Sequence, residues 1–157
     1  GSEMCIRDRN DIFYCRTKKM FPVSMRDGVK LFTVVYEPKD KSRKYPILFN
    51  RTPYGSGPYG PDEFKESIGP NSLLEKSGYI FVYQDVRGRY MSEGTFDNMR
   101  PNIPGNNKRN KNDIDESSDM FDTIEWLLKN IKNNKEIYVD YGDEYDFDEP
   151  TRHTTKW

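Results

Sequence analysis

The chain has 157 residues and a formal net charge of -1, which is enough for one domain and too little for two of full size. Hydrophobic residues make up 34% and charged residues 32%, and the mean hydropathy is -0.99, so little apolar surface is available for a core. This charge balance excludes a nucleic-acid binder that depends on an overall positive field. Because no run approaches the roughly 18 consecutive apolar residues of a membrane span, we expect neither nucleic acid nor membrane as a partner.

The N-terminal segment is predicted to lack regular structure. Its first nine residues read GSEMCIRDR, show no periodicity and resemble translated sequencing-adaptor text. Residues 1–17 are therefore expected to be a non-native or disordered leader. Cys5 and Cys15 are interpreted as free thiols, and with the single, distant His153 they offer no metal-ligand spacing.

The next segment predicts a β-hairpin. Apolar residues dominate positions 20–25 and 31–36, and Asp27 and Gly28 separate the two runs. An Asp-Gly pair between β-rich runs indicates a tight turn, because the turn needs a positive φ that glycine adopts without strain.

Two short apolar runs, 47–49 and 79–83, predict strands that are buried on both faces. A loop rich in glycine and proline and a short helix join them. Gly78 is expected to cap the carboxyl end of this helix.

The clearest helix follows a polar loop. Asp113 and Glu116 stand at the spacing of a capping box, and an apolar stripe at helical periodicity runs through 120–131. Residues 137–139 predict another strand. The order of elements indicates an α/β fold, in which a β-hairpin precedes parallel strands with crossover helices. Beyond 139, six of the ten residues from 140 to 149 are acidic, and residues 140–157 are expected to be a disordered or aberrant tail.

Polar motifs follow both buried strands. Tyr54 belongs to the sequence Arg-Thr-Pro-Tyr-Gly after the first strand, where a rigid turn could hold a phenol over the carboxyl end of the sheet. From spacing alone, we favour the interpretation that Tyr54 packs against its own loop, which is rich in glycine and proline. After the second strand, Asp85 and Arg87 could pair across a loop or bind an anionic substrate group, and structural pairing is the interpretation we favour.

Four linked motifs resemble those of one enzyme family. They read MRDGVKLFTVVYEPKD, KYPILFNRTPYGSGPYG, GYIFVYQDVRGRYMSEGTF and DIDESSDMFDTIEWLLKN, and they cover about residues 18 to 134. In this order they resemble the X-Pro dipeptidyl-peptidase and cocaine-esterase (CocE/NonD) family. The resemblance implies that residues 18–139 are the N-terminal portion, incomplete, of an α/β-hydrolase domain.

The resemblance also implies a chemistry. Family members carry a serine nucleophile in a Gly-x-Ser-Tyr-x-Gly elbow, followed by an aspartate and a histidine, and they cleave small-molecule ester, amide or peptide substrates through an acyl-enzyme. By resemblance, Tyr54 would donate its hydroxyl to the oxyanion. No metal or organic cofactor is implied.

The chain departs from the family where the elbow should stand. An ungapped reading places Glu144 at the serine position, the last serine of the chain is Ser118, and the single histidine is His153. Ser56 and Ser92 are interpreted as loop serines, since neither is in a strand-turn-helix elbow. We therefore expect a catalytically incomplete fragment of a serine hydrolase, truncated or frame-shifted near residue 135. The alternative is a non-catalytic binding domain derived from the same front half.

Overall fold

The computed structural model describes residues 2–7, 13–98, 100–103, 111–132, 134–140 and 155–156. Its elements in chain order are β1 (Ser2–Arg7), β2 (Phe13–Ser24), β3 (Lys30–Pro38), β4 (Tyr45–Thr52), α1 (Ser72–Lys76), β5 (Ile80–Asp85), α2 (Glu116–Asn130), β6 (Asn134–Asp140) and β7 (Thr155–Lys156). Every strand and helix predicted from the sequence is present. The α/β class is therefore confirmed.

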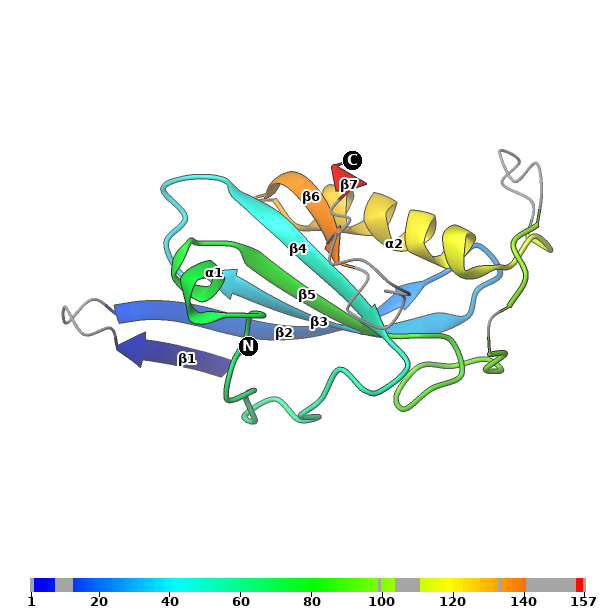
Figure 1. Cartoon of the computed structure of the whole chain (residues 1–157), viewed down its shortest axis with the longest axis horizontal. Helices are drawn as coiled ribbons and strands as arrows, with labels where there is room; N and C mark the ends of the chain where they lie inside the picture. Colours follow the sequence, from blue (N-terminus) through cyan, green and yellow to red (C-terminus); the bar gives the residue numbers. More distant parts are fainter. Residues whose placement is uncertain are drawn as a thin grey trace, which may run out of the picture.

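The strands that the structure describes form one mixed sheet in the order β1-β2-β3-β5-β4-β6-β7 (Figure 1). β1, β2, β3 and β5 pair antiparallel in succession, whereas β4 lies parallel to both β5 and β6. The prediction that the later strands are parallel is confirmed. Since β4, β5 and β6 run in the same direction, their carboxyl ends lie at one end of the sheet.

The predicted hairpin joins β2 and β3. Ser24 pairs with Lys30 as the last rung of the ladder, and the Met25 N–H donates to the Val29 carbonyl at 2.8 Å across the turn. Gly28 has a φ of 89°, a left-handed conformation that glycine adopts without a steric penalty. The Asp-Gly signal therefore identified the turn correctly.

The N-terminal residues differ from the expectation. The structure places Ser2–Arg7 in β1, paired with β2, where the sequence predicted no regular structure. Cys5 and Cys15 are directly opposite in this pairing and form a disulfide with a Cα–Cα distance of 4.0 Å. The interpretation as free thiols was wrong, because an antiparallel register brings two residues ten positions apart to within bonding distance.

The two faces of the sheet pack against different parts of the chain. α2 covers one face, where Leu127 and Ile131 pack with Val35, Phe49 and Val82. On the other face, alternate strand residues pack against the loop between β4 and β5 and against α1. β5 is buried on both faces, as predicted. β4 is less completely buried than β5, because Leu48, on the face that α1 covers, is only half-buried.

α2 begins two residues later than the sequence predicted. Asp115, not Asp113, is the N-cap: its carboxylate accepts the Ser118 N–H at 2.7 Å, and the Ser118 hydroxyl accepts the Asp115 N–H at 2.9 Å. The predicted box with Asp113 and Glu116 was wrong, because serine can complete this reciprocal pair as glutamate does. The helix itself is confirmed. α1 ends as predicted, with Gly78 at a φ of 84° just beyond the C-cap Ser77.

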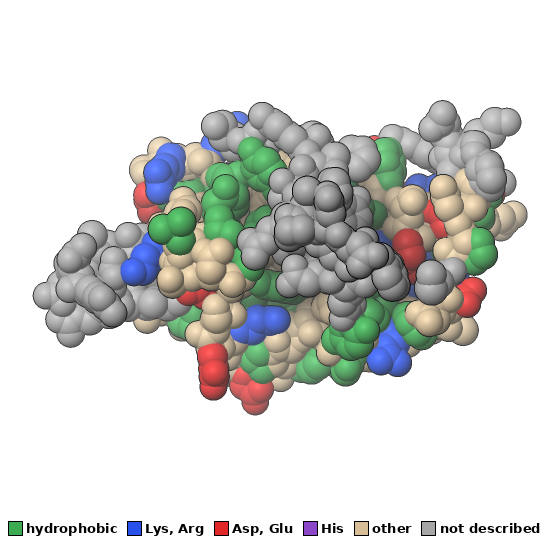
Figure 2. Space-filling view, viewed as in Figure 1, with side chains coloured by type: hydrophobic (Ala, Val, Ile, Leu, Met, Phe, Trp, Pro, Cys, Tyr) green, Lys and Arg blue, Asp and Glu red, His purple; other side chains and the backbone are tan. Residues whose placement is uncertain are grey.

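Two surface properties bear on partners. Among the described residues, no helix is long and apolar enough to cross a bilayer. On the face in Figure 2, the coloured basic and acidic side chains are interspersed rather than gathered in one large patch. Most of the predicted acidic tail, residues 141–154 and 157, falls outside the part that the structure describes.

Candidate functional site at the carboxyl ends of β4 and β5

Tyr54 lies in the turn directly after β4, at the end of the sheet where β5 and β6 also finish. Its side chain is 65% exposed. Its backbone N–H donates to the Thr52 hydroxyl at 3.1 Å, which tightens the turn around Pro53. The structure thus places Tyr54 on a largely exposed turn at this end of the sheet.

Asp85 organises the loops on either side of this turn. Its side chain is fully buried and accepts hydrogen bonds from the Ser56 N–H at 2.6 Å, the Tyr59 hydroxyl at 3.0 Å and the Met91 N–H at 3.2 Å. A carboxylate that accepts several hydrogen bonds links the groups that donate them. The two loops therefore share one anchor, which agrees with a structural role for Asp85.

Tyr59 remains a hydrogen-bond donor over the whole physiological range. Burial and the adjacent Asp85 carboxylate raise the pKa of Tyr59 to about 12. Its ring stacks on Tyr90 with centroids 6.2 Å apart. Gly55, next to Tyr54, lies close to the Tyr90 ring, since a Cβ added to this glycine would be 3.2 Å from Cζ of Tyr90. The Tyr54 turn and the Tyr90 loop therefore pack against each other.

Three large side chains are exposed in these two loops: Tyr54, Tyr90 at 55% and Met91 at 59%. Tyr90 has a φ of 47°, an uncommon conformation for a residue that is not glycine and one that tends to occur at functional sites. Arg89 donates to the Pro53 carbonyl at 3.1 Å and so links this loop to the Tyr54 turn. The two loops therefore present exposed aromatic and thioether side chains, and the Arg89 guanidinium lies 5.4 Å from the centre of the Tyr90 ring.

Lys18, in β2, binds the loop that follows Tyr54. Its ammonium is buried and donates to the carbonyls of Pro58, Gly60 and Glu63 at 2.9, 2.8 and 2.6 Å. Burial lowers the pKa of Lys18 below its ordinary value. This role could not be recognised from the sequence, because a lysine in an alternating strand is usually exposed to solvent.

Arg87 forms ion pairs with two carboxylates inside the protein. Its guanidinium is buried between two carboxylates, with Nη1 2.7 Å from Asp27 and Nη2 2.7 Å from Asp119. Burial alone would lower the pKa of Arg87, but the hydrogen bonds to both carboxylates outweigh it and raise the pKa. Asp85 and Arg87 do not pair with each other, yet each makes structural contacts, as we favoured. The anion-binding alternative has no free guanidinium to use.

The nucleophile has no candidate among the described residues at this end of the sheet. The Ser92 hydroxyl donates to the Asp85 carbonyl at 2.7 Å and accepts the Phe32 N–H at 2.8 Å, and Ser56 is fully buried. Glu144 and His153 fall outside the described ranges. No cluster of three potential metal ligands occurs within those ranges either.

Most of the chain matches the model of one protein family. Residues 27–139 match the model of the X-Pro dipeptidyl-peptidase (S15 family), and this segment runs from β3 to Val139 in β6 and includes both helices. The chain belongs to the X-Pro dipeptidyl-peptidase (S15) family. The matched segment carries Tyr54, Asp85 and Arg87, whereas Lys18 precedes it.

Individual relatives agree with this assignment. A cocaine esterase from Rhodococcus sp. (strain MB1 Bresler) is 35% identical over 109 residues, which are 68% of this chain and 16% of the esterase. The solved structure of an α-amino-acid ester hydrolase has a TM-score of 0.65 at 35% identity and covers 79% of this chain and 20% of its own. An aminopeptidase from the marine sediment archaeon Thaumarchaeota archaeon has a TM-score of 0.60 at 34% identity, covering 79% of this chain and 21% of its own.

These likenesses confirm that the sheet is the N-terminal part of an α/β-hydrolase-like fold. A CocE/NonD family hydrolase from Staphylococcus aureus, 20% identical with a TM-score of 0.55, supports the same fold over 88% of this chain and 25% of its own. The chain spans about a fifth of the length of the S15-type relatives that it matches.

Proposed function

We propose that this chain is the front part of the catalytic domain of a serine hydrolase that cleaves ester or amide bonds, including peptide bonds, through an acyl-enzyme. The observation that carries the proposal is the position of Tyr54 at the carboxyl end of β4, on a turn that is anchored by Asp85 and Lys18. Members of its family and its relatives are named for hydrolysis of esters or peptides.

In the proposed reaction, a serine hydroxyl attacks the carbonyl carbon of the substrate while a histidine takes the hydroxyl proton. The carbonyl oxygen becomes an oxyanion, to which Tyr54 would donate a hydrogen bond together with a backbone N–H. Collapse of this intermediate expels the alcohol or amine, which leaves with the proton from the histidine. Water then attacks the acyl-serine by the same route and releases the acid.

The anchoring of the turn that carries Tyr54 supports this role. A hydrogen-bond donor stabilises a developing charge best when it needs no rearrangement during the reaction. The Tyr54 turn is anchored through Asp85 to the neighbouring loop and through Lys18 to β2. The exposed side chains of Tyr90 and Met91 would contact the acyl or leaving group.

The chain as given is proposed to be inactive alone, because no serine follows Ser118 and no histidine precedes His153. The test begins with the purified chain, which should neither hydrolyse p-nitrophenyl acetate nor react with a fluorophosphonate probe. Sequencing the source DNA beyond codon 135 should then reveal an in-frame Gly-x-Ser-Tyr-x-Gly motif. In the protein encoded by that frame, Tyr54→Phe should lower kcat by about 10²–10³ with little change in KM.

Tyr79→Phe is the matched control, since Tyr79 lies before β5 at the opposite end of the sheet, and it should retain kcat. Full activity of Tyr54→Phe would contradict the oxyanion role. Probe labelling of the isolated chain would contradict its inactivity.

A non-catalytic binding domain is the second candidate. It is favoured by the apolar surface of Tyr54, Tyr90 and Met91, which is exposed although the described serines nearby are buried or bonded to the backbone. This candidate predicts a reading frame without a later serine and saturable binding of a non-hydrolysable amide to the isolated chain. An in-frame elbow serine would rule it out.

A further inference from the structure

One guanidinium at the candidate active site has donors that the protein does not use. Arg89 lies in the loop after β5, and its Nε donates to the carbonyl of Pro53, the residue before Tyr54, at 3.1 Å. Within the described part of the chain, the Arg89 guanidinium makes no further hydrogen bond and no ion pair, and neither of its terminal nitrogens is among the buried atoms that lack a partner. Since a guanidinium has five N–H donors, four of them are open to solvent beside the Tyr54 turn.

Two aromatic rings hold this guanidinium in position. Cζ of Arg89 lies 5.4 Å from the centre of the Tyr90 ring and 5.0 Å from that of the Phe96 ring, and the residue is half-buried. Stacking on aromatic rings suits a guanidinium, which is more weakly hydrated than an ammonium group. With the bond to Pro53, these contacts fix the group before any ligand arrives, so binding costs less conformational entropy.

The carboxylates of the same loop are engaged elsewhere. Asp85 is fully buried and accepts hydrogen bonds from the two loops that it anchors. Glu93 accepts a backbone N–H of β3 at 3.0 Å, and Asp97 lies 4.0 Å from Nε of Arg100. The loop therefore leaves the charge of Arg89 without an anionic partner.

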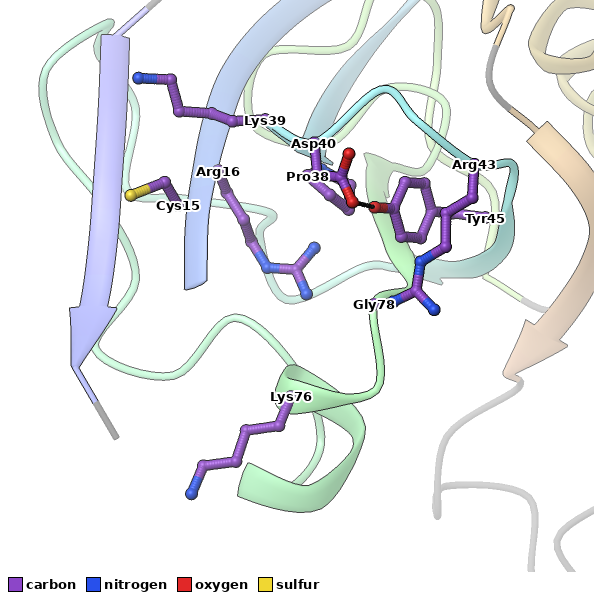
Figure 3. Close-up of a pocket in the computed structure, with 9 residues that line it drawn as sticks. All are labelled: Cys15, Arg16, Pro38, Lys39, Asp40, Arg43, Tyr45, Lys76 and Gly78. Atoms are coloured by element: carbon purple, nitrogen blue, oxygen red, sulfur yellow. Dashed lines mark hydrogen bonds between the residues drawn. The ribbon is translucent and has the colours of Figure 1, made fainter. Parts of the chain in front are cut away.

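The basic residues at the opposite end of the sheet are arranged differently. They line a pocket of about 290 Å³ at the amino ends of β4 and β5 (Figure 3). Arg16 donates there to two backbone carbonyls at 2.5 and 2.6 Å, and Lys39 pairs with Glu3. In Figure 3 the ammonium groups of Lys39 and Lys76 point away from the space between Arg16 and Arg43. The basic side chains of this pocket therefore do not converge on one ligand.

We propose that Arg89 binds a carboxylate of the substrate and so selects esters or amides that carry a negative charge near the scissile bond, which rests on the hydrolase function proposed above. The two terminal nitrogens of a guanidinium present parallel N–H groups that match the two oxygens of a carboxylate. One carboxylate balances the charge of Arg89, whereas a phosphate monoester would bring a second charge without a partner. The exposed side chains of Tyr90 and Met91, next in the chain, would contact the hydrocarbon part of the ligand.

The first test measures binding by the purified chain of 157 residues and needs no turnover. The probes are N-benzoylglycine and its amide, which differ only in the carboxylate. The titration is followed by NMR of ¹³C-labelled methionine methyl groups, and Met91→Leu identifies the Met91 signal. N-benzoylglycine should shift this signal with a dissociation constant of about 1–10 mM. The amide should bind about fivefold to tenfold more weakly, since one charge-assisted pair of hydrogen bonds is lost.

Variants separate recognition of the carboxylate from support of the loop. Arg89→Gln should remove the preference for N-benzoylglycine over its amide, and Arg89→Lys, which keeps the charge without the fork, should retain a preference of about twofold to threefold. Arg100→Gln is the matched control, because Arg100 donates to the Thr95 carbonyl and makes no bond to the Tyr54 turn. It should leave the preference unchanged.

Two binding results would overturn the proposal. The first is equal binding of the two probes by the wild-type chain. The second is an equal loss of affinity for both probes in Arg89→Gln, which would mean that Arg89 only supports the loop.

The second test uses the protein encoded by the continued reading frame, with monomethyl adipate and dimethyl adipate as substrates. Arg89→Gln should lower the ratio of their kcat/KM values about fivefold to tenfold, whereas Tyr54→Phe should lower kcat for both substrates alike. Turnover with a ratio that does not depend on Arg89 would overturn this proposal and leave the hydrolase proposal standing. Binding of N-benzoylglycine through Arg89 in a chain whose reading frame has no elbow serine would keep the carboxylate site and overturn the hydrolase proposal.

Discussion

Arg87 divides its guanidinium between carboxylates from two distant parts of the chain. Asp27 comes from the β2–β3 turn and Asp119 from the first turn of α2, and Arg87 itself follows β5. All three side chains are largely buried, so solvent screens their interaction weakly. At the scale of single residues, this triad joins the hairpin, the central strands and the helix.

Asp27→Asn should destabilise the chain by about 2 kcal/mol at pH 7, because one of the two charged partners of Arg87 is lost. Burial tends to raise the pKa of Asp27, but hydrogen bonds from Arg87 and from the Val29 N–H outweigh it, and the pKa lies below its ordinary value of 3.8. The carboxylate therefore contributes stability that is complete above pH 3.8 and is lost as the pH falls through the lowered pKa.

Urea unfolding at pH 7 and near pH 3 checks this expectation. The difference between wild type and Asp27→Asn should narrow on acidification, and Asp62→Asn, at an exposed position, should show little difference at either pH. A gap of constant size would mean that the ionised form of Asp27 is not what stabilises the fold.

α2 depends on an N-cap that also fixes the loop before it. The Asp115 carboxylate is 1% exposed and accepts N–H groups from Ser118 at 2.7 Å and from Ile103 at 3.0 Å. It thereby satisfies one of the unpaired donors of the helix start and a donor of the preceding loop. One carboxylate therefore fixes both the first residue of α2 and the position of the loop at Ile103 relative to the start of the helix.

Asp115→Ala should lower the free energy of unfolding by about 1–2 kcal/mol, through the loss of this cap. The midpoint of thermal unfolding, followed by circular dichroism, measures the effect. Asp113→Ala makes the same change two residues earlier, where no cap is observed, and should leave the midpoint nearly unchanged. Equal losses in the two variants would show that general acidity near the helix start, and not the cap, is responsible.

The elements themselves were predictable, and their exact ends were not. The apolar stripe of α2 and the runs of β4 and β5 follow from periodicity and local propensity. Asp115 is the N-cap because its carboxylate and the Ser118 hydroxyl form the reciprocal hydrogen bonds of the cap. The sequence does not distinguish this pair from Asp113 with Glu116, since both pairs have the same spacing. β1 was missed because its residues show no alternation of apolar and polar types. Its strand conformation depends on backbone pairing with β2, which no local pattern in the sequence reveals.

At the level of the whole molecule, the sheet has its candidate active site at one end and a disulfide at one edge. Tyr54 follows β4, whereas Arg16 and Tyr45 line a pocket at the amino ends of β4 and β5. β1 is an edge strand, and the Cys5–Cys15 bond ties it to β2. A covalently held edge strand is less able to pair with another chain.

Reducing this disulfide should destabilise the molecule by about 2–3 kcal/mol, since the bond closes a short loop of the unfolded chain. Cys5→Ser should produce the same loss without reductant. Thiol titration in denaturant gives the direct check: the untreated chain should show no reactive thiol, and the reduced chain should show two. Two thiols before reduction would contradict the pairing.

The location of the candidate active site was predictable, but the way it is held was not. Tyr54 could be placed at the end of β4 because the buried run and the Arg-Thr-Pro-Tyr turn are adjacent in sequence. The anchors of its loop, Lys18 and Asp85, stand tens of residues away on either side. Contacts of that range leave no periodic signal, and the same holds for Arg16, whose carbonyl partners are about sixty residues distant.

The triad of Asp27, Arg87 and Asp119 also limits how sequences of this kind can diverge. Losing either carboxylate leaves the Arg87 guanidinium short of one partner, and losing the arginine removes the charged partner of Asp27 and the nearer of the two arginines beside Asp119. Single replacements are therefore penalised, while a joint replacement by uncharged residues of similar volume is not. Among homologues, the three positions should vary together or not at all.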